Sequence, residues 1–145
     1  MSDTREVIEI DVPMADLYET LIDFDCYADF LSEVSECRRV GGEDGVHLVD
    51  YTIEVIKRIE YQLRFVEERP RRLTWSLSTP GKIIRENNGS WDLEDLDGAR
   101  TRATYSLEIK PRVFVPKAVI TRLTTITLPS LLKQFKAEAE RRHKG

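Results

Sequence analysis

The stretch VHLVDYTIEVIKR at residues 46–58 alternates apolar and polar side chains, so that Tyr51 shares a face with the apolar residues two positions away on either side. The next stretch, IEYQLRFVEE at residues 59–68, repeats this alternation and places Tyr61 and Phe65 on one face. A period of two is typical of a strand with one buried and one solvated face. The two stretches therefore predict neighbouring antiparallel strands whose buried face is rich in aromatic side chains.

Alternation of the same kind extends outward from this pair of strands. It predicts further strands at residues 6–12, 72–78, 90–94 and 100–110. Strand signals run almost unbroken from Val34 to Ile109, interrupted by clusters with turn chemistry. These clusters are Gly41–Gly45, Pro70, Thr79–Gly81 and Asp97–Gly98. About six strands are therefore expected between residues 34 and 109.

Helical spacing replaces the period of two at both ends of this strand region. After Pro13, which suits the first position of a helix, Leu17, Leu21 and Phe24 form one stripe, and a second short helix is expected from Tyr27 to Leu31. From Pro116 to His143 the apolar residues that recur at helical spacing are Val119, Leu123, Ile126, Leu132, Phe135 and Ala139. Pro129 is expected to kink this region or to divide it into two helices.

The order of these elements predicts an α+β fold. A helix as long as the C-terminal one can bury its apolar stripe only against the apolar face of the sheet. We therefore expect a curved antiparallel sheet wrapped around a long C-terminal helix, with two short helices after the first strand. A chain of 145 residues fits one domain, residues 1–145.

Composition excludes several classes of function. A net charge of −4 does not suit binding to a nucleic-acid backbone, which requires clustered Lys and Arg. No apolar run approaches the length of a membrane span, so only transient contact with a membrane surface is expected. The N-terminus has no apolar core of a secretion signal, and Cys26 and Cys37 lack metal-ligand spacing. We expect a cytoplasmic protein with two reduced thiols.

No catalytic, metal or cofactor motif is present in the sequence. His47 stands beside a turn and His143 near the C-terminal end, so neither is a strong candidate for acid–base catalysis. The segment Asp23-Phe24-Asp25 begins like a calcium loop but lacks the glycine and the terminal glutamate of that motif. We therefore predict no catalytic residue, no metal ligand and no cofactor.

Two segments resemble the START/Bet v1-like helix-grip superfamily, in particular its branch of polyketide cyclases/dehydrases and coenzyme Q-binding proteins. The segment DFDCYADFL at residues 23–31 is similar to the D-x-x-x-Y-x-x-F-L motif of that branch. Gly89-Ser90-Trp91, followed by Asp97-Gly98 and a Thr-rich strand, resembles its G-x-W … G-x-x-T stretch. Together with the final amphipathic helix, the likeness covers nearly the whole chain.

This resemblance implies a cavity between the sheet and the C-terminal helix. Relatives use it for lipids, isoprenoid quinones, polyketides and other apolar ligands, and many of them only carry the ligand. The leading hypothesis is therefore non-catalytic binding of a hydrophobic small molecule. The alternatives are an enzyme of the cyclase/dehydratase type and a protein-interaction module like the ribosome-association branch. Fold alone does not decide among them.

The segment before Gly89 departs from the branch, which favours apolar or aromatic residues there. If the strand is regular back from Trp91, then Asn87 and Arg85 face the cavity and place an amide and a guanidinium among apolar walls. If Asn88-Gly89 is instead a hairpin turn, Arg85 is solvated. The nine residues we predict to contact the ligand are Tyr51, Tyr61, Phe65, Trp75, Arg85, Trp91, Tyr105, Val119 and Leu123.

Overall fold

The computed structural model of the protein describes residues 2–54, 58–79, 84–111, 114, 116–122 and 128–144. For residues 2, 3, 119, 120 and 122 it describes the backbone alone.

Seven antiparallel strands form one sheet in the order β1-β7-β6-β5-β4-β3-β2. The strands are β1 (Ser2–Ile10), β2 (Val34–Glu43), β3 (Val46–Glu54), β4 (Arg58–Glu68), β5 (Arg72–Leu77), β6 (Ile84–Asp95) and β7 (Thr101–Pro111). Strands β2 to β7 pair with their neighbours in the chain, and β1 pairs with β7 at the far edge. The expected run of six strands after the first helices is confirmed.

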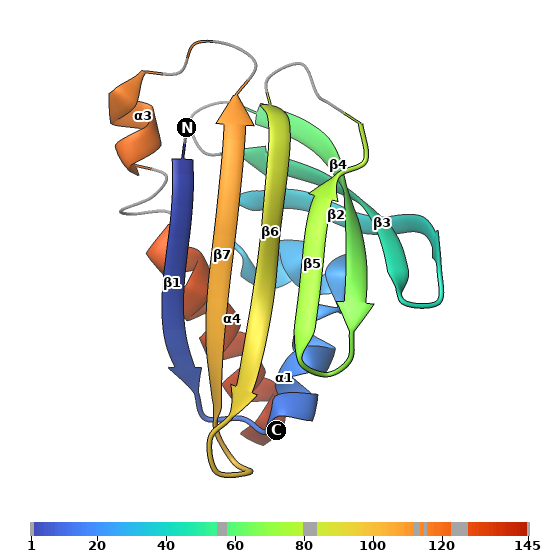
Figure 1. The fold of residues 1–145 in the computed structure, drawn as a ribbon, viewed down its shortest axis with the longest axis vertical. Helices are drawn as coiled ribbons and strands as arrows, with labels where there is room; N and C mark the ends of the chain where they lie inside the picture. The colour runs from blue at the N-terminus through green and yellow to red at the C-terminus, as the bar shows by residue number, and fades with distance from the viewer. Residues whose placement is uncertain are drawn as a thin grey trace.

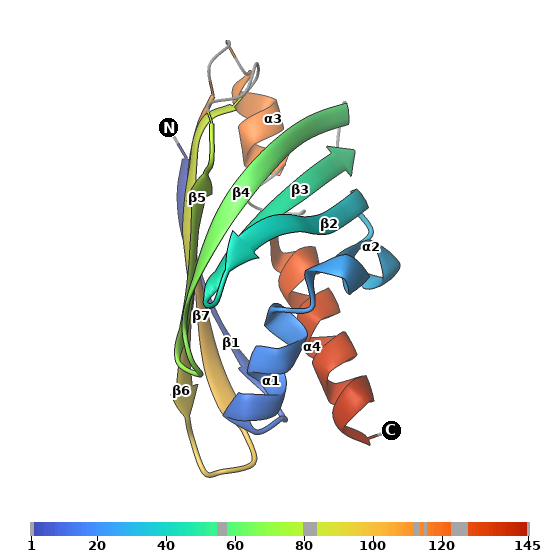
Figure 2. The same cartoon turned by 90° about the vertical axis from the view of Figure 1, so that its right-hand side faces the viewer.

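The helices lie on one side of this sheet, which bends around them (Figures 1 and 2). They are α1 (Met14–Leu21), the 3-10 helix η1 (Phe24–Cys26), α2 (Tyr27–Phe30), α3 (Lys117–Arg122) and α4 (Leu128–Lys144). The described residues of the C-terminal region form two helices, which is one of the two outcomes, a kink or a division, that we expected from Pro129. Pro129 lies in the first turn of α4, where a missing backbone N–H leaves no hydrogen bond unmade. The α+β fold, with a curved antiparallel sheet around the C-terminal helix, is confirmed.

Helix α4 packs its apolar stripe against the concave face of the sheet. Leu132, Phe135 and Ala139 are buried, which confirms the predicted stripe within α4. Leu128, which was not among the predicted residues, is buried as well. Of the other predicted stripe residues, Leu123 and Ile126 lie outside the described residues, and Val119 is described only by its backbone in α3.

Polar contacts fix the C-terminal half of α4 to the N-terminal part of the chain. The backbone N–H of Asp11 donates to Glu140 at 2.9 Å, and Lys136 donates to the carbonyl oxygen of Glu9 at 2.7 Å. Arg142 forms an ion pair with Asp23 at 3.1 Å. These contacts connect α4 with the end of β1 and with the segment after α1, so the helix is held from both sides of the fold.

The predicted strand faces are buried as expected. Trp75 and Trp91 are 7% and 2% exposed, and Val49, Leu73 and Ala103 on the same face are 0% exposed.

Both cysteines, Cys26 and Cys37, are free. In the part of the chain that the structure describes, no helix is long and apolar enough to cross a membrane.

A β-bulge in β6 changes the facing of one predicted site residue. Residues 88 and 89 lie within β6 and form no turn, so the strand continues as one of our two interpretations proposed. The pairing skips Arg85, however, because Ile84 pairs with Pro111 and Glu86 with Lys110. An extra residue inverts the alternation beyond it. Asn87 is therefore buried at 4%, whereas Arg85 is exposed, and the expectation that Arg85 faces the interior is wrong.

Gly89 provides the space in which the Trp75 indole lies. A Cβ atom added at Gly89 would stand 2.2 Å from Cζ2 of Trp75, far inside van der Waals contact. The indole Nε1–H donates to Oδ1 of Asn87 at 3.2 Å, so the ring is held between a glycine and an amide of the same strand. The glycine of the G-x-W segment is therefore required by its cross-strand neighbour.

We expect Gly89→Ala to destabilise the protein by about 1–3 kcal/mol, because the added methyl group forces Trp75 out of its position. Urea unfolding followed by tryptophan fluorescence measures this change. Gly41→Ala is the matched control, since a Cβ atom there meets only Cδ1 of Leu48 at an ordinary 3.6 Å. Equal stabilities of the two variants would contradict the close approach.

Candidate ligand-binding interior

Six aromatic side chains form a continuous series across the concave face of the sheet. Neighbouring ring centroids in this series lie 4.9–6.3 Å apart, and the first two rings are stacked with an interplanar angle of 5°. In order, the rings belong to Tyr61, Tyr51, Phe65, Trp75, Tyr105 and Trp91. Because they come from β3, β4, β5, β6 and β7, alternation in five separate strands directs them to one surface.

Helix residues close this surface from the other side. Phe135 of α4 contacts Trp91 and Tyr27 edge-on, with centroids 5.3 and 5.2 Å apart. Tyr27 in turn contacts Tyr51 at 6.1 Å. The Tyr27 hydroxyl donates to the carbonyl oxygen of Leu21, so this tyrosine is already satisfied within the protein.

Three other tyrosines bring hydroxyl groups to the same interior. Burial raises the pKa of Tyr51, Tyr61 and Tyr105, and for Tyr51 and Tyr61 the neighbouring phenol and thiol groups raise it further. Burial likewise raises the pKa of the Cys37 thiol, to about 12, although a hydrogen bond from Tyr51 opposes the rise. All these groups are therefore neutral at physiological pH. They can donate hydrogen bonds to a ligand and are poor general bases.

The aromatic face is tightly closed at one end and more open at the other. Val49, Leu73 and Ala103 are fully buried, whereas inner-face residues nearer to α3 remain partly exposed. The partly exposed residues are Ile53, Tyr61, Leu77 and Leu107. Ile53 and Leu77 lie at the C-terminal ends of β3 and β5, Tyr61 lies in the first half of β4, and Leu107 lies in the second half of β7. Strand β7 runs upward in Figure 1, and the chain continues from its upper end toward α3.

The structure brings together six of the nine predicted site residues, namely the six members of the aromatic series. Arg85 points away from them. The side chain of Val119 and all of Leu123 lie outside the described residues. No group of three or more His, Cys, Asp and Glu side chains in the described ranges is arranged to hold a metal ion.

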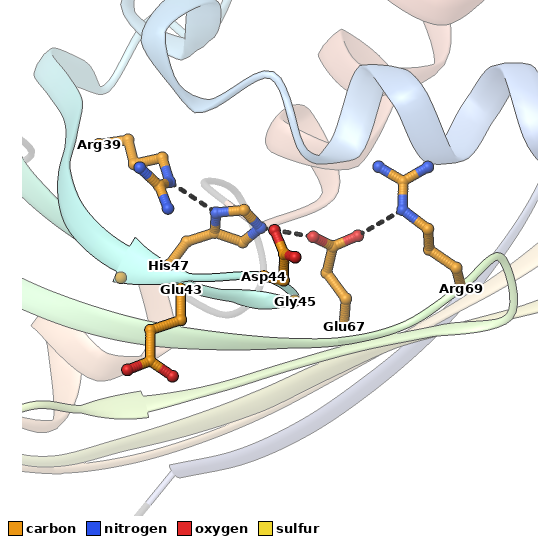
Figure 3. Close-up of a pocket in the computed structure, with 8 residues that line it drawn as sticks. Arg39, Glu43, Asp44, Gly45, His47, Glu67 and Arg69 are labelled. Atoms are coloured by element: carbon orange, nitrogen blue, oxygen red, sulfur yellow. Dashed lines mark hydrogen bonds and ion pairs between the residues drawn. The ribbon is translucent and has the colours of Figure 1, made fainter.

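A polar group at the opposite end of the same face escaped the sequence analysis. His47 and Glu67 lie on the inner face, below α1, and line a pocket of about 720 Å³ together with Arg39 and Arg69 (Figure 3). The alternation in the sequence could have predicted their inward facing. His47 continues the alternation of Val49 and Tyr51, and Glu67 continues that of Leu63 and Phe65. We had set His47 aside because it stands beside a turn, but its side chain is only 15% exposed.

Solved structures with the same architecture come from several organisms. A START superfamily protein from Mycobacterium smegmatis superimposes with a TM-score of 0.85 at 15% identity, over 97% of this chain and 98% of that chain. The Zhui aromatase/cyclase from a Streptomyces species gives 0.83 at 16% identity, over 97% and 94%. A STAR-related lipid transfer protein from Xanthomonas axonopodis gives 0.81 at 14% identity, over 95% and 85%. At these identities the likeness establishes the fold alone.

A family assignment follows from the sequence itself. The search of curated proteins found no match. Residues 10–136 match the family described as polyketide cyclase / dehydrase and lipid transport. This match covers most of the chain, including all the strands from β2 to β7 and most of α4, and it agrees with the START-like fold of the structural neighbours. The chain therefore belongs to the polyketide cyclase / dehydrase and lipid transport family.

Proposed function

We propose that the protein binds an apolar, ring-containing small molecule between the concave face of the sheet and its C-terminal helices, and that it does so as a carrier without chemical turnover. Such a ligand would lie against the aromatic series and receive hydrogen bonds from the tyrosine hydroxyls. Sites for small molecules typically combine apolar walls with a few polar anchors, as this face does.

The observation that carries the proposal is the partial exposure of apolar side chains on the inner face of the sheet, beside residues of the same face that are fully buried. Ile53, Leu77 and Leu107 lie on the inner face of the sheet, yet they are less covered than Val49, Leu73 and Ala103 of the same face, which are 0% exposed. Burying each CH₂ group of a ligand there contributes about 0.8 kcal/mol. A ligand with two or three fused rings can thus reach micromolar affinity without any charged contact.

The chemical state of the interior favours binding over catalysis. The tyrosines and Cys37 are neutral donors, and the described part of the aromatic series includes no histidine or carboxylate. Glu6 is the nearest alternative, because it stands opposite Tyr105 in the β1–β7 register and is partly buried. A cyclase or dehydratase would use such a carboxylate as a general base. Water loss from a polyketide-like substrate, abolished by Glu6→Gln, would establish the enzyme and refute the carrier.

We expect the protein to bind anthraquinone in one saturable site, measured by equilibrium dialysis. Leu107→Trp fills the partly exposed end of the inner face and should weaken binding at least about tenfold, because the indole occupies the ligand's space. Ser106→Trp is the matched control, since it adds the same side chain one residue away on the outer face of β7 and should leave binding unchanged. The absence of saturable binding, or equal effects of the two variants, would contradict the proposal.

A second prediction concerns the tyrosine hydroxyls. Tyr61→Phe should weaken the binding of anthraquinone by about two- to tenfold and leave that of anthracene unchanged, because a net hydrogen bond contributes about 0.5–1.5 kcal/mol and only the quinone can accept one. Tyr27→Phe serves as the control, since its hydroxyl already donates to Leu21. Removing the Tyr27 hydroxyl should lower the stability of the fold without changing the preference of the protein for anthraquinone over anthracene. If Tyr61→Phe weakens both ligands equally, the hydroxyl is no anchor.

A further inference from the structure

The polar pocket around His47 is separated from the aromatic interior by two phenylalanines. The Phe24 ring contacts the His47 ring with centroids 5.2 Å apart and the Phe65 ring at 4.5 Å. Phe24 and Phe65 therefore stand between the imidazole and the rest of the aromatic series. The pocket itself is lined by charged residues, by His47 and by glycines of the β2–β3 hairpin (Figure 3).

Glu67 fixes the orientation of the imidazole. Its carboxylate accepts hydrogen bonds from Tyr18 at 3.0 Å, from Arg69 at 2.8 Å and from Nε2 of His47 at 2.5 Å. Burial opposes the ionisation of Glu67, but the hydrogen bonds from His47 and Tyr18 and the charge of Arg69 outweigh it and lower the pKa of this carboxyl. An ionised and fully engaged carboxylate holds the proton of His47 on Nε2.

The other imidazole nitrogen is the acceptor for Arg39. The guanidinium Nε–H of Arg39 donates to Nδ1 of His47 at 2.7 Å. A protonated imidazole carries a proton on both nitrogens and cannot accept a hydrogen bond. This contact therefore requires neutral His47, and protonation of Nδ1 would break it.

Arg39 reaches the pocket without a carboxylate partner. It stands opposite Val49 in the β2–β3 register, which places it on the inner face at the edge strand, and it is exposed. No carboxylate among the described residues lies within ion-pair distance of its guanidinium, whereas Arg69 pairs with both Glu67 and Glu19. A guanidinium presents a planar fork of donors that matches a carboxylate, and a neutral imidazole nitrogen occupies only one of them.

We propose that this pocket is a proton-linked site for a small aromatic carboxylate. The carboxylate of the ligand accepts hydrogen bonds from the guanidinium of Arg39, and the hydrogen bond from Arg39 to Nδ1 of His47 breaks. Nδ1 of His47 then takes up one proton from solvent. Arg39, protonated His47 and ionised Glu67 then alternate in charge with the bound carboxylate. The site is independent of the ligand proposed for the interior.

The charges around His47 set the class of anion that fits. Those near it on the packed elements are Arg39 on β2, Glu43 and Asp44 at the hairpin, Glu67 on β4, Arg69 after β4, Tyr18 and Glu19 on α1, and Asp25 on η1. The Asp25 carboxylate accepts the backbone N–H of Arg39 at 2.9 Å. Two acidic residues at the hairpin disfavour a dianion more than a single carboxylate. A volume of about 720 Å³ is ample for one aromatic ring. The site therefore favours benzoate over inorganic phosphate.

Benzoate titration of the full chain by calorimetry, in two buffers of different ionisation heat, tests the proposal. Binding should be saturable, take up protons, and be tighter near pH 6 than near pH 8, because a ligand that favours protonated His47 is itself favoured by protonation. Arg39→Gln should abolish it. Arg38→Gln is the matched control, since Arg38 is the exposed neighbour of Arg39 on the same strand. It stands opposite Asp50 in the β2–β3 register, on the outer face of the sheet. His47→Gln should remove the pH dependence.

The results that would overturn this proposal differ from those that would overturn the proposed ligand binding in the aromatic interior. Benzoate binding that is absent, independent of pH, or equal in Arg39→Gln and Arg38→Gln would show that the Arg39–His47–Glu67 contacts only fasten the hairpin. Binding lost in Leu107→Trp would place benzoate in the aromatic interior and equally refute this site. Thermal unfolding of each variant confirms that a loss of binding is not a loss of fold.

Discussion

The fold depends on Phe135, the residue through which α4 contacts both the sheet and the short helices. Its ring lies 5.3 Å from Trp91 on β6, 5.2 Å from Tyr27 and 5.3 Å from Phe30 on α2, in each case edge to face. Such pairs add about 0.5–1.5 kcal/mol each to the gain from area burial. Because a curved sheet cannot bury its own concave face, this contact supplies the cover without which the aromatic series would face water.

That cover is uneven, and the unevenness divides the inner face into parts with different chemistry. Around Ile10, Leu73 and Ala103 the face is fully buried. Toward α3 it remains apolar but partly exposed, and toward the β2–β3 hairpin it ends in His47, Glu67 and their arginine partners. One alternating pattern in β3 and β4 therefore runs through two candidate sites, a neutral apolar one and a charged one, with Phe24 and Phe65 between them.

The sequence predicted most of the architecture because it records alternation directly. The strands, their buried faces and the division of the C-terminal helices followed from period and proline position. Arg85 was misplaced because a single-residue bulge at Ile84–Glu86 leaves no local sequence signal and yet inverts every facing beyond it. The polar pocket was missed for another reason: His47 was judged by its place beside a turn, and the place of Glu67 on the alternating face was not considered. Ionisable residues are rare on a buried face, so the alternation alone gave little reason to look for them there.

The central claim is that the concave face receives an apolar ligand, and intermolecular nuclear Overhauser effects in the complex with anthraquinone test it most directly. The account predicts contacts from the ligand protons to the ring protons of Tyr61 and Tyr105 and to the methyl groups of Leu77 and Leu107. Contacts confined to outer-face residues such as Ser106, or to the His47 pocket, would contradict it.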